Sequence, residues 1–260
     1  EHLSSKVLFD TYLDLRRPGD ALVVMGDLGD AARDYAPDTK PEVLTAREQL
    51  VAALGRPGRV FAIAPQQELC QLHRDLSGKP YFVIDDRNMR SLLLSNRVDG
   101  TTDKNPLATR ILHAEPKNIP YRPKGRVVWD NQIELLGWDM PKSVGRGAKF
   151  QVTMYYHVLQ HVGSNWSNVL FHFDGALRFN GDHPPIDGRC ATTVWQKDDY
   201  IVDTTTVVAG GPAFATGTYE VWTGFFSGTA PNWRNMPVSQ APGDMRDTAD
   251  RVKITSITLE

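Results

Sequence analysis

No apolar run in this sequence of 260 residues approaches the ~20 residues that a membrane-spanning helix needs. The segments Ala21–Met25 and Val60–Ala64 are among the longest runs, and each has the length of one strand. An excess of charge is also missing, because 29 basic and 31 acidic side chains leave a formal net charge of -2. This balance gives no electrostatic reason to expect nucleic acid or an anionic membrane surface as a partner.

Cysteine is scarce as well, with Cys70 and Cys190 as the two examples. Their wide separation excludes the short spacings that are typical of zinc sites and redox pairs. Two buried free thiols are the expected state of these residues. A disulfide between them is the alternative if the protein works outside the cytoplasm.

Catalytic signatures are absent too. The sequence contains no phosphate-binding loop, dinucleotide-binding glycine pattern, serine nucleophile elbow or zinc-protease helix. The chain begins with Glu1-His2-Leu3 and carries no signal peptide. We therefore expect a non-catalytic fragment of a longer polypeptide, whose targeting segments lie outside this sequence.

The first 98 residues alternate between helical and extended patterns, which predicts a small α/β domain with a largely parallel sheet. Apolar spacing predicts a helix near the N-terminus and a second helix that starts after a Thr39 cap and ends at Gly55. The expected strands are the following: Ala21–Met25, Val60–Ala64, Tyr81–Ile84 and Ser91–Ser95.

From residue 127 to residue 260 the apolar period changes to two. Lys149–Leu159 is the clearest case, with apolar side chains at every second position. Turn signals separate the further strands that this period predicts, which are the following: Gln132–Trp138, Asn168–Phe173, Thr192–Trp195, Tyr200–Val208, Thr218–Phe226 and Arg251–Leu259. The pattern predicts an antiparallel, jelly-roll-like β-sandwich, joined to the α/β domain by a connector over residues 99–126. The fold class is therefore α+β in two parts.

The densest polar cluster lies in the turns of the predicted sandwich, at Asp174, Asp182, His183 and Asp187. Carboxylates on such turns can hold calcium, which accepts several oxygen ligands in a flexible geometry. The alternative interpretation is structural, since aspartate, asparagine and glycine are the ordinary residues of turns. These four residues are the first candidates for a ligand or metal site, with calcium as the candidate cofactor.

Aromatic side chains suggest a second kind of site. Trp166, Trp195 and Trp222 lie on or beside predicted sandwich strands, as do Tyr200 and Trp233. An exposed indole can stack on a sugar ring, and we select Trp166, Trp195 and Trp222 as candidates. Packing in the core or at its rim is the alternative for each of them.

Adjacent carboxylates follow a predicted strand at Asp85 and Asp86. Neighbouring side chains on an extended chain point to opposite sides, so an ion pair with Arg87 or a helix cap is the expected role. A secreted carbohydrate-active enzyme remains the alternative class. Its two facing carboxylates would come from the following candidates: Asp27, Asp85, Asp86, Asp174 and Asp182.

A series of short motifs in the second half follows a recognisable order. The motifs are Ile133–Asp139, Gly147 before a strand that ends in Tyr155-Tyr156, Phe171–Asp174, Asp182–Pro185, Thr192–Trp195, Tyr200–Asp203 and Gly217–Phe226. The series resembles the soluble C-terminal region of bacterial multi-spanning glycosyltransferases similar to the dolichyl-phosphate-mannose protein mannosyltransferases. The resemblance covers about 131–259.

The resemblance implies an extracytoplasmic domain at the periplasmic face of the inner membrane. The family's catalytic acidic residues lie between membrane helices that this sequence does not contain, so no catalytic residue carries over. The implied role is an accessory one, in which the domain contacts a glycan or protein acceptor. Its implied partner is the membrane-embedded part of the same polypeptide. A secreted carbohydrate-binding protein, with or without calcium, is the other alternative.

Overall fold

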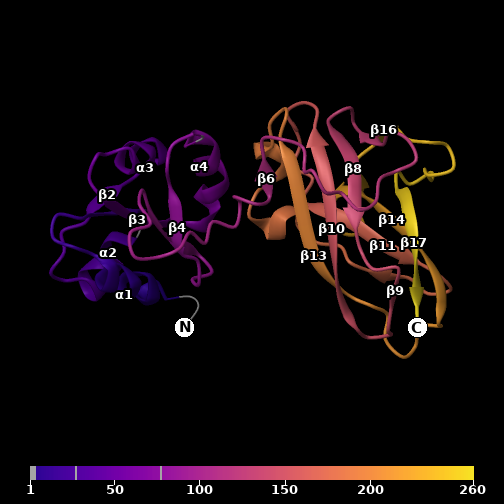
Figure 1. The fold of residues 1–260 in the computed structure, drawn as a ribbon, viewed down its shortest axis with the longest axis horizontal. Coiled ribbons are helices and arrows are strands. Elements are labelled where there is room, and N and C mark those ends of the chain that lie inside the picture. Colours follow the sequence, from indigo (N-terminus) through magenta and orange to yellow (C-terminus); the bar gives the residue numbers. More distant parts are fainter. Residues whose placement is uncertain (1–3, 27, 77) are drawn as a thin grey trace. The chain divides into compact units, whose positions relative to one another are not determined.

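The computed structural model describes residues 4–26, 28–76 and 78–260. The chain divides into two compact units, Glu1–Leu107 and Ala108–Glu260, and each is described by itself (Figure 1). The division falls inside the segment 99–126, for which the sequence predicts a connector. Among the described residues, no helix combines the length and apolar character that are needed to cross a membrane.

The first unit contains one sheet with strand order β2-β1-β3-β5-β4. The strand bounds are Ala21–Met25 for β1, Glu42–Leu44 for β2, Val60–Pro65 for β3, Phe82–Asp85 for β4 and Ser91–Ser95 for β5. Strand β1 runs parallel to β2 and β3, whereas β5 runs antiparallel to β3 and β4. The sheet is therefore mixed, because the five residues between β4 and β5 are too few for a parallel crossover.

Four α-helices accompany this sheet: α1 Lys6–Leu15, α2 Leu28–Tyr35, α3 Arg47–Leu54 and α4 Leu69–Asp75. The sequence-based start of a helix at Thr39 is wrong, because Glu42–Leu44 pairs with β1 as a strand. Helix α3 begins later, where Gln49 Oε1 accepts hydrogen bonds from the backbone amides of Thr45 and Ala46 at 2.8 and 3.1 Å. Sheet pairing thus overrides a local capping pattern.

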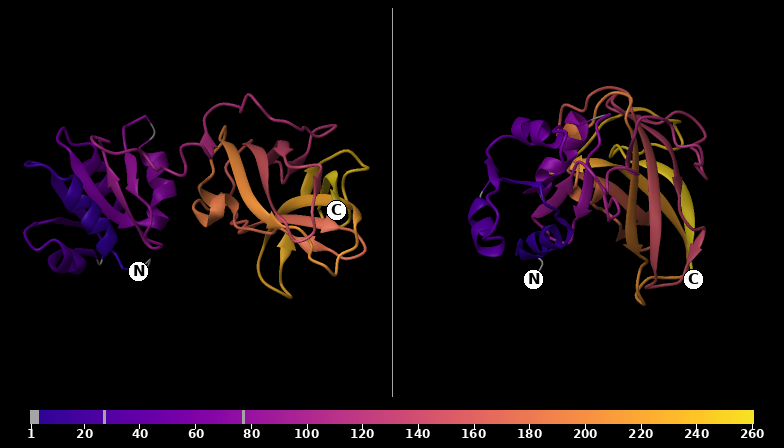
Figure 2. Two further views of the ribbon diagram at one scale, coloured as in Figure 1. Left: turned by 60° about the horizontal axis from the view of Figure 1, so that its bottom comes forward. Right: turned by 60° about the vertical axis from the view of Figure 1, so that its left-hand side comes forward.

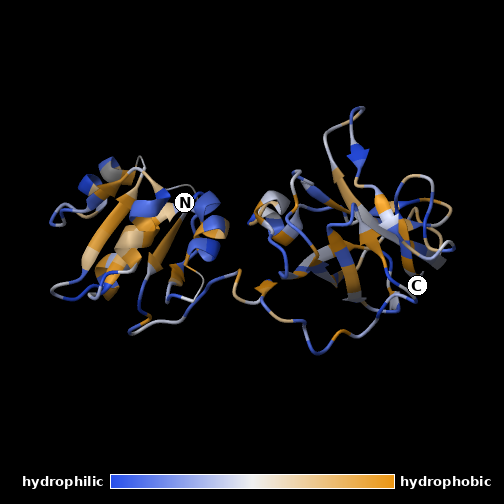
Figure 3. Cartoon of the chain, turned by 90° about the horizontal axis from the view of Figure 1, so that it is seen from above, coloured by the Kyte–Doolittle hydropathy of each residue, from blue (hydrophilic) through white to orange (hydrophobic). Residues whose placement is uncertain are grey.

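Apolar side chains of α1, β1 and β3 form the core of this unit. Leu8 and Phe9 pack with Val24, Phe61 and Ile63, and all five are inaccessible to solvent. Figure 3 shows the apolar residues concentrated on the strands of the sheet. Burial of these groups is the main source of stability for a unit of this size.

The second unit is built from two sheets of short and long strands, with a sandwich-like arrangement (Figure 2). The first sheet has the order β16-β7-β8-β10-β13-β6, with the bounds Val238–Gln240, Val128–Trp129, Ile133–Asp139, Lys149–Val158, Tyr200–Val208 and Ile111–Leu112. The second sheet has the order β12-β11-β14-β17-β9, with the bounds Phe179–Asn180, Asn168–Asp174, Gly217–Ser227, Val252–Leu259 and Ser143–Val144. Strand β15 (Arg234–Asn235) pairs with β14.

The period-two pattern is confirmed along β10, where Phe150, Val152, Met154, Tyr156 and Val158 are buried and the residues between them are more exposed. Aromatic rings fill the space between the sheets. The ring centroid of Phe225 lies 5.5 Å from that of Trp129, 5.1 Å from that of Tyr156 and 6.2 Å from that of Trp195. The expected strand at Thr192–Trp195 is instead a 3₁₀ turn over Thr192–Val194, which places Trp195 in this core.

Part of the predicted connector belongs to the second unit. Strand β6 pairs with β13, and Tyr121 forms an isolated bridge with Trp138. The amide of Tyr121 donates to the Trp138 carbonyl at 3.1 Å, and the amide of Trp138 donates back at 2.9 Å. Gly137 permits this contact, because a side chain there would collide with the Tyr121 carbonyl oxygen and with Ile119.

Candidate functional site

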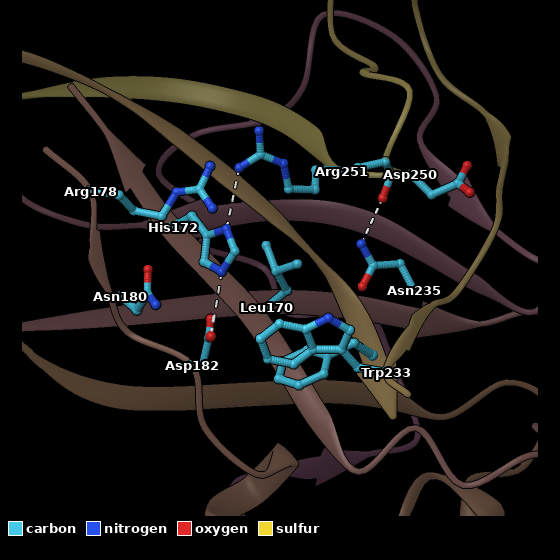
Figure 4. Close-up of a pocket in the computed structure, with 11 residues that line it drawn as sticks. Leu170, His172, Arg178, Asn180, Asp182, Trp233, Asn235, Asp250 and Arg251 are labelled. Atoms are coloured by element: carbon cyan, nitrogen blue, oxygen red, sulfur yellow. Dashed lines mark hydrogen bonds and ion pairs between the residues drawn. The ribbon is translucent and has the colours of Figure 1, made fainter. Parts of the chain in front are cut away.

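The outer face of the second sheet carries a cluster of polar residues. On β11, Val169, Phe171 and Phe173 point into the core, so the alternate residues Leu170 and His172 lie on the opposite face. A hollow of about 580 Å³ opens over this face (Figure 4). Its lining residues are Leu170, His172, Arg178, Asn180, Asp182, Phe226, Trp233, Asn235, Ala249, Asp250 and Arg251.

His172 stands at the centre of a polar network in this hollow. Arg251 Nη1 lies 3.2 Å from His172 Nδ1, and His172 Nε2 lies 3.4 Å from a carboxylate oxygen of Asp182 (Figure 4). Because a guanidinium only donates hydrogen bonds, Nδ1 accepts and the ring proton lies on Nε2, facing Asp182. The other oxygen of Asp182 accepts the backbone amide of Phe171 at 2.7 Å, which fixes the carboxylate in place.

Two arginines hold the carboxylate of Asp174 beside the hollow. Arg178 Nε donates to Asp174 at 2.5 Å and Arg251 Nη1 donates at 2.9 Å. Burial alone would raise the pKa of Asp174, but the hydrogen bonds from Arg178 and Arg251 hold that pKa below its ordinary value. Asp174 is therefore an ionised structural anchor for the two arginines.

Trp233 supplies the largest exposed aromatic surface of the site. Its side chain is 62% exposed, and its ring stands edge-on to that of Phe226 at a centroid distance of 6.3 Å. Phe226 and Leu170 add apolar surface to the lining. Nearby, Asn235 Nδ2 donates to the Ala249 carbonyl at 2.6 Å, which leaves its Oδ1 available to a ligand (Figure 4). The hollow thus combines an open indole with a rim of fixed donors and acceptors.

The four sequence-based ligand candidates fall into two places. Asp174 and Asp182 belong to the network around His172. Asp187 lies elsewhere and pairs with Arg110 at 2.9 Å. In the described part of the chain, no group of three or more His, Cys, Asp or Glu side chains is arranged to hold a metal ion. The four candidates therefore do not form the shared calcium site that their sequence proximity suggested.

His183 is an internal ion-pair partner. Its Nδ1 lies 2.7 Å from the Gly181 carbonyl oxygen and its Nε2 lies 2.8 Å from Asp203, whose carboxylate is fully buried. Burial on its own would lower the pKa of His183, but the hydrogen bond and charge of Asp203 outweigh it and raise the pKa. Asp203 also accepts the amide of Ile186 at 2.8 Å, at a turn where Ile186 and Asp187 have positive φ angles of 52° and 53°.

The three tryptophans selected from the sequence are all less exposed to solvent than Trp233. Trp195 and Trp166 are 0% and 3% exposed, so their selection as sugar platforms is wrong. The ring of Trp195 packs against that of Phe225, and the guanidinium of Arg234 lies over the ring of Trp166 at 5.0 Å. Trp222 is half-buried, and its ring carries Arg251 at 4.8 Å and Lys253 at 5.9 Å. Trp233, named in the sequence but not selected, follows Pro231-Asn232 in a loop. Exposure separates it from Trp166 and Trp195, which also lie outside the strands, and the sequence carries no signal for this difference.

Asp85 in the first unit is structural, as expected. Its carboxylate is fully buried, accepts Arg87 Nη2 at 2.5 Å and accepts the Thr11 hydroxyl at 2.7 Å. Burial would raise the pKa of Asp85, but these hydrogen bonds lower it to about 2. Asp27 lies outside the described residues. Because Asp85 is held by Arg87 and Thr11, it is not available as a catalytic carboxylate.

The two cysteines are not free thiols. Cys70 and Cys190 are each disulfide-bonded, which corrects the expectation of two buried thiols. Both side chains are also buried from solvent. Absence of a short spacing motif therefore did not indicate the oxidation state, because disulfides can join residues at any sequence separation.

No protein-family model matches this chain, and no curated protein matches its sequence. Among solved structures, 55% of the chain is similar to 82% of the C-terminal domain of wzt, at 10% identity and a TM-score of 0.34. In a second similarity, 54% of the chain matches 98% of a Niemann-Pick type C2 protein from the Japanese carpenter ant, at 12% identity and a TM-score of 0.30. Both similarities are too weak to indicate a function.

Proposed function

We propose that the β-sandwich unit is a non-catalytic carbohydrate-binding domain whose ligand lies over Trp233. The observation that carries this proposal is the 62% exposed indole beside the apolar residues Phe226 and Leu170, within a hollow rimmed by polar side chains. Binding sites for small ligands commonly combine aromatic and apolar lining with a few convergent polar groups in a concave surface.

Sugar chemistry fits the two components of the hollow. A pyranose ring has apolar C–H faces, which pack on an indole, and peripheral hydroxyls, which both donate and accept hydrogen bonds. The rim offers acceptors at Asp182 and Asn235 and donors at Arg178. Because Arg178 and Arg251 are compensated by Asp174, the rim presents hydrogen-bonding groups without a large excess of charge. This balance favours a neutral or weakly charged glycan.

The carboxylates in and beside the hollow already accept hydrogen bonds from the chain itself, which supports a binding role over glycoside hydrolysis. Hydrolysis needs one carboxyl group that donates a proton and a second that acts as base or nucleophile. Asp174 is held ionised by two arginines, and Asp250 accepts both Arg246 Nη2 at 2.7 Å and the Val238 amide at 3.1 Å. Asp182, the other carboxylate of the lining, accepts the Phe171 amide and lies 3.4 Å from His172 Nε2.

The wider context that we propose follows from the sequence resemblance. We infer that an α/β domain followed by a jelly-roll-like sandwich forms the extracytoplasmic accessory region of a membrane glycosyltransferase, where it contacts a glycan or protein acceptor. The two disulfide-bonded cysteines support an oxidising compartment. The full-length reading frame tests this context: hydrophobic spans upstream of residue 1 support it, whereas a cleavable signal peptide directly upstream contradicts it.

A glycan array tests the binding role. The array carries linear mono- to hexasaccharides of mannose, glucose, galactose and glucuronic acid, and it is probed with the labelled 260-residue chain with and without EDTA. We expect binding that survives the chelator and that falls at least ~tenfold in Trp233→Ala. Val208→Ala is the matched control, because Val208 is an exposed apolar residue outside the hollow.

Two outcomes would overturn the proposal. The first is binding to no glycan on the array. The second is a Trp233→Ala variant that binds as well as the wild-type chain. Loss of binding in EDTA would instead favour the calcium-dependent alternative, and it would require a metal site that the described residues do not display.

A further inference from the structure

A second hollow, of about 500 Å³, opens on the same sheet as the Trp233 hollow. Strands β14 and β17 contribute Thr218, Glu220, Lys253, Ile254, Thr255 and Ser256, and the remaining lining residues are Arg122, Lys124, Trp138, Asp244 and Met245. Arg122 and Lys124 belong to the connector segment, which packs on the sandwich through the Tyr121–Trp138 bridge beside Gly137. Among the described residues, none lines both hollows.

Trp222 lies between a residue of the first hollow and a residue of the second. On the outer face, His172 of the first hollow lies opposite Trp222 in the β11–β14 register, and Lys253 of the second hollow lies opposite Trp222 in the β14–β17 register. Paired strands are about 4.8 Å apart, so these three residues form one short row across the sheet. Arg251, from the first hollow, lies over the same ring as Lys253.

The second hollow also has the chemistry of a sugar subsite. Thr218 and Ser256 bring exposed hydroxyls, and Lys253 pairs with Glu220 at 3.2 Å, so that donors and acceptors lie side by side. Aromatic surface comes from Tyr121, which is 36% exposed and stacks at a centroid distance of 6.4 Å on the buried ring of the lining residue Trp138. As in the first hollow, aromatic surface is combined with compensated charge.

We propose that the two hollows are subsites of one extended cleft, which binds several consecutive residues of a linear oligosaccharide. This inference rests on the proposed carbohydrate-binding function and adds the length of the ligand to it. One end of the chain stacks on Trp233, the middle crosses the row formed by His172, Trp222 and Lys253, and the other end reaches Ser256 and Lys124. Lys253, whose side chain is 37% exposed over the Trp222 ring, faces the crossing glycan as a hydrogen-bond donor to its hydroxyl and ring oxygens.

A single sugar residue would need only one hollow. Two hollows on one continuous strand face let a longer ligand gain contacts without paying again for lost translational freedom. Affinity should therefore rise with oligosaccharide length until both hollows are filled. Two independent monosaccharide sites would show no such dependence.

The experiment measures dissociation constants of the 260-residue chain by calorimetry. The probes are the di-, tri- and hexasaccharides of the sugar that gives the strongest signal on the array described above. Ser256→Arg fills the second hollow with a long side chain from an exposed strand position. Thr206→Arg is its matched control, since Thr206 is an exposed strand threonine on the other sheet.

We expect the wild-type chain to bind the hexasaccharide at least ~tenfold more tightly than the disaccharide. Ser256→Arg should abolish this gain and leave disaccharide binding unchanged, while Thr206→Arg changes neither. Equal hexasaccharide affinity in Ser256→Arg and the wild type overturns the extended cleft. If Trp233→Ala still abolishes binding in that case, the proposed carbohydrate-binding function stands. Binding to no oligosaccharide overturns both.

Discussion

His183 Nε2 lies 2.8 Å from the carboxylate of Asp203, inside the β-sandwich unit. The other ring nitrogen faces the Gly181 carbonyl oxygen at 2.7 Å. A backbone carbonyl and a carboxylate both accept hydrogen bonds, so this pair of partners favours the imidazolium form, in which both ring nitrogens donate. The pair also fixes the Ile186 turn through the second oxygen of Asp203, and thereby ties one of the predicted ligand loops to the core.

This pair makes the stability of the β-sandwich unit depend on pH. The folded-state pKa of His183 is raised above its ordinary value, so the stabilisation is full below about pH 6.5, the unfolded-state value. It is lost as the pH rises through the raised pKa. Urea titrations at several pH values check this, followed by tryptophan fluorescence, since all six tryptophans lie in this unit.

His183→Gln should flatten that pH dependence, and the exposed His113→Gln should leave it unchanged. Asp203→Asn should cost about 3–5 kcal/mol of unfolding free energy, because it leaves a buried charge without its partner. A wild-type unfolding free energy that stays constant from pH 6 to pH 9 would refute the imidazolium assignment.

Asp85 gives the first unit the opposite pH dependence. Its pKa is lowered to about 2, so its contribution is present above the unfolded value near 4 and is lost as the pH falls towards 2. Asp85→Asn should cost about 2 kcal/mol at pH 7, and the exposed Asp38→Asn should cost almost nothing. Circular dichroism at the helix band reports on this unit, which holds the four described α-helices. Equal loss in both variants would contradict the prediction.

Gly137→Ala tests how the connector reaches the sandwich. An added methyl group would collide with the Tyr121 carbonyl, so the bridge between Tyr121 and Trp138 should open at a cost of about 1–3 kcal/mol. Gly145→Ala is the control, because a methyl group there meets nothing within 4 Å. Thermal melting measures the cost, and a similar Tm for both variants would show that the connector does not need Gly137.

The cysteine state predicts a chemical result. Iodoacetamide should modify neither Cys70 nor Cys190 in the unfolded, unreduced chain, and should modify both after reduction. Reduction should also lower the Tm, since native disulfides contribute about 2–4 kcal/mol. Mass spectrometry counts the modified sites, and electrophoresis without reductant separates a bond within one chain from a bond between copies. Two modified cysteines before reduction would refute the assignment.

Several strands could be predicted from the sequence because burial on one face leaves a period of two. Tyr200–Val208 was predicted with the bounds that the structure has, and Lys149–Val158 differs from its prediction by one residue. Helix α2 and the direction of β5 could not be predicted in this way. The first depends on packing of a short, mostly polar segment, and the second on the number of residues that join β4 to β5.

The site could be predicted only in part. Asp174 and Asp182 were selected because carboxylates on turns can bind a cation, and both belong to the network around the hollow. Arg251 and His172 were not selected, since their meeting depends on pairing of strands that are far apart in the sequence. Burial separates Trp195 from Trp233, and that quantity is a property of the folded chain.

Nuclear magnetic resonance of the six indole N–H groups tests the central claim most directly. The chain is titrated with the hexasaccharide that binds best on the array, and the signal of Trp233 is assigned by its loss in Trp233→Phe. We predict a saturable shift of the Trp233 signal, with little change for the buried Trp166 and Trp195. A hexasaccharide that binds while the Trp233 signal stays in place would contradict the account.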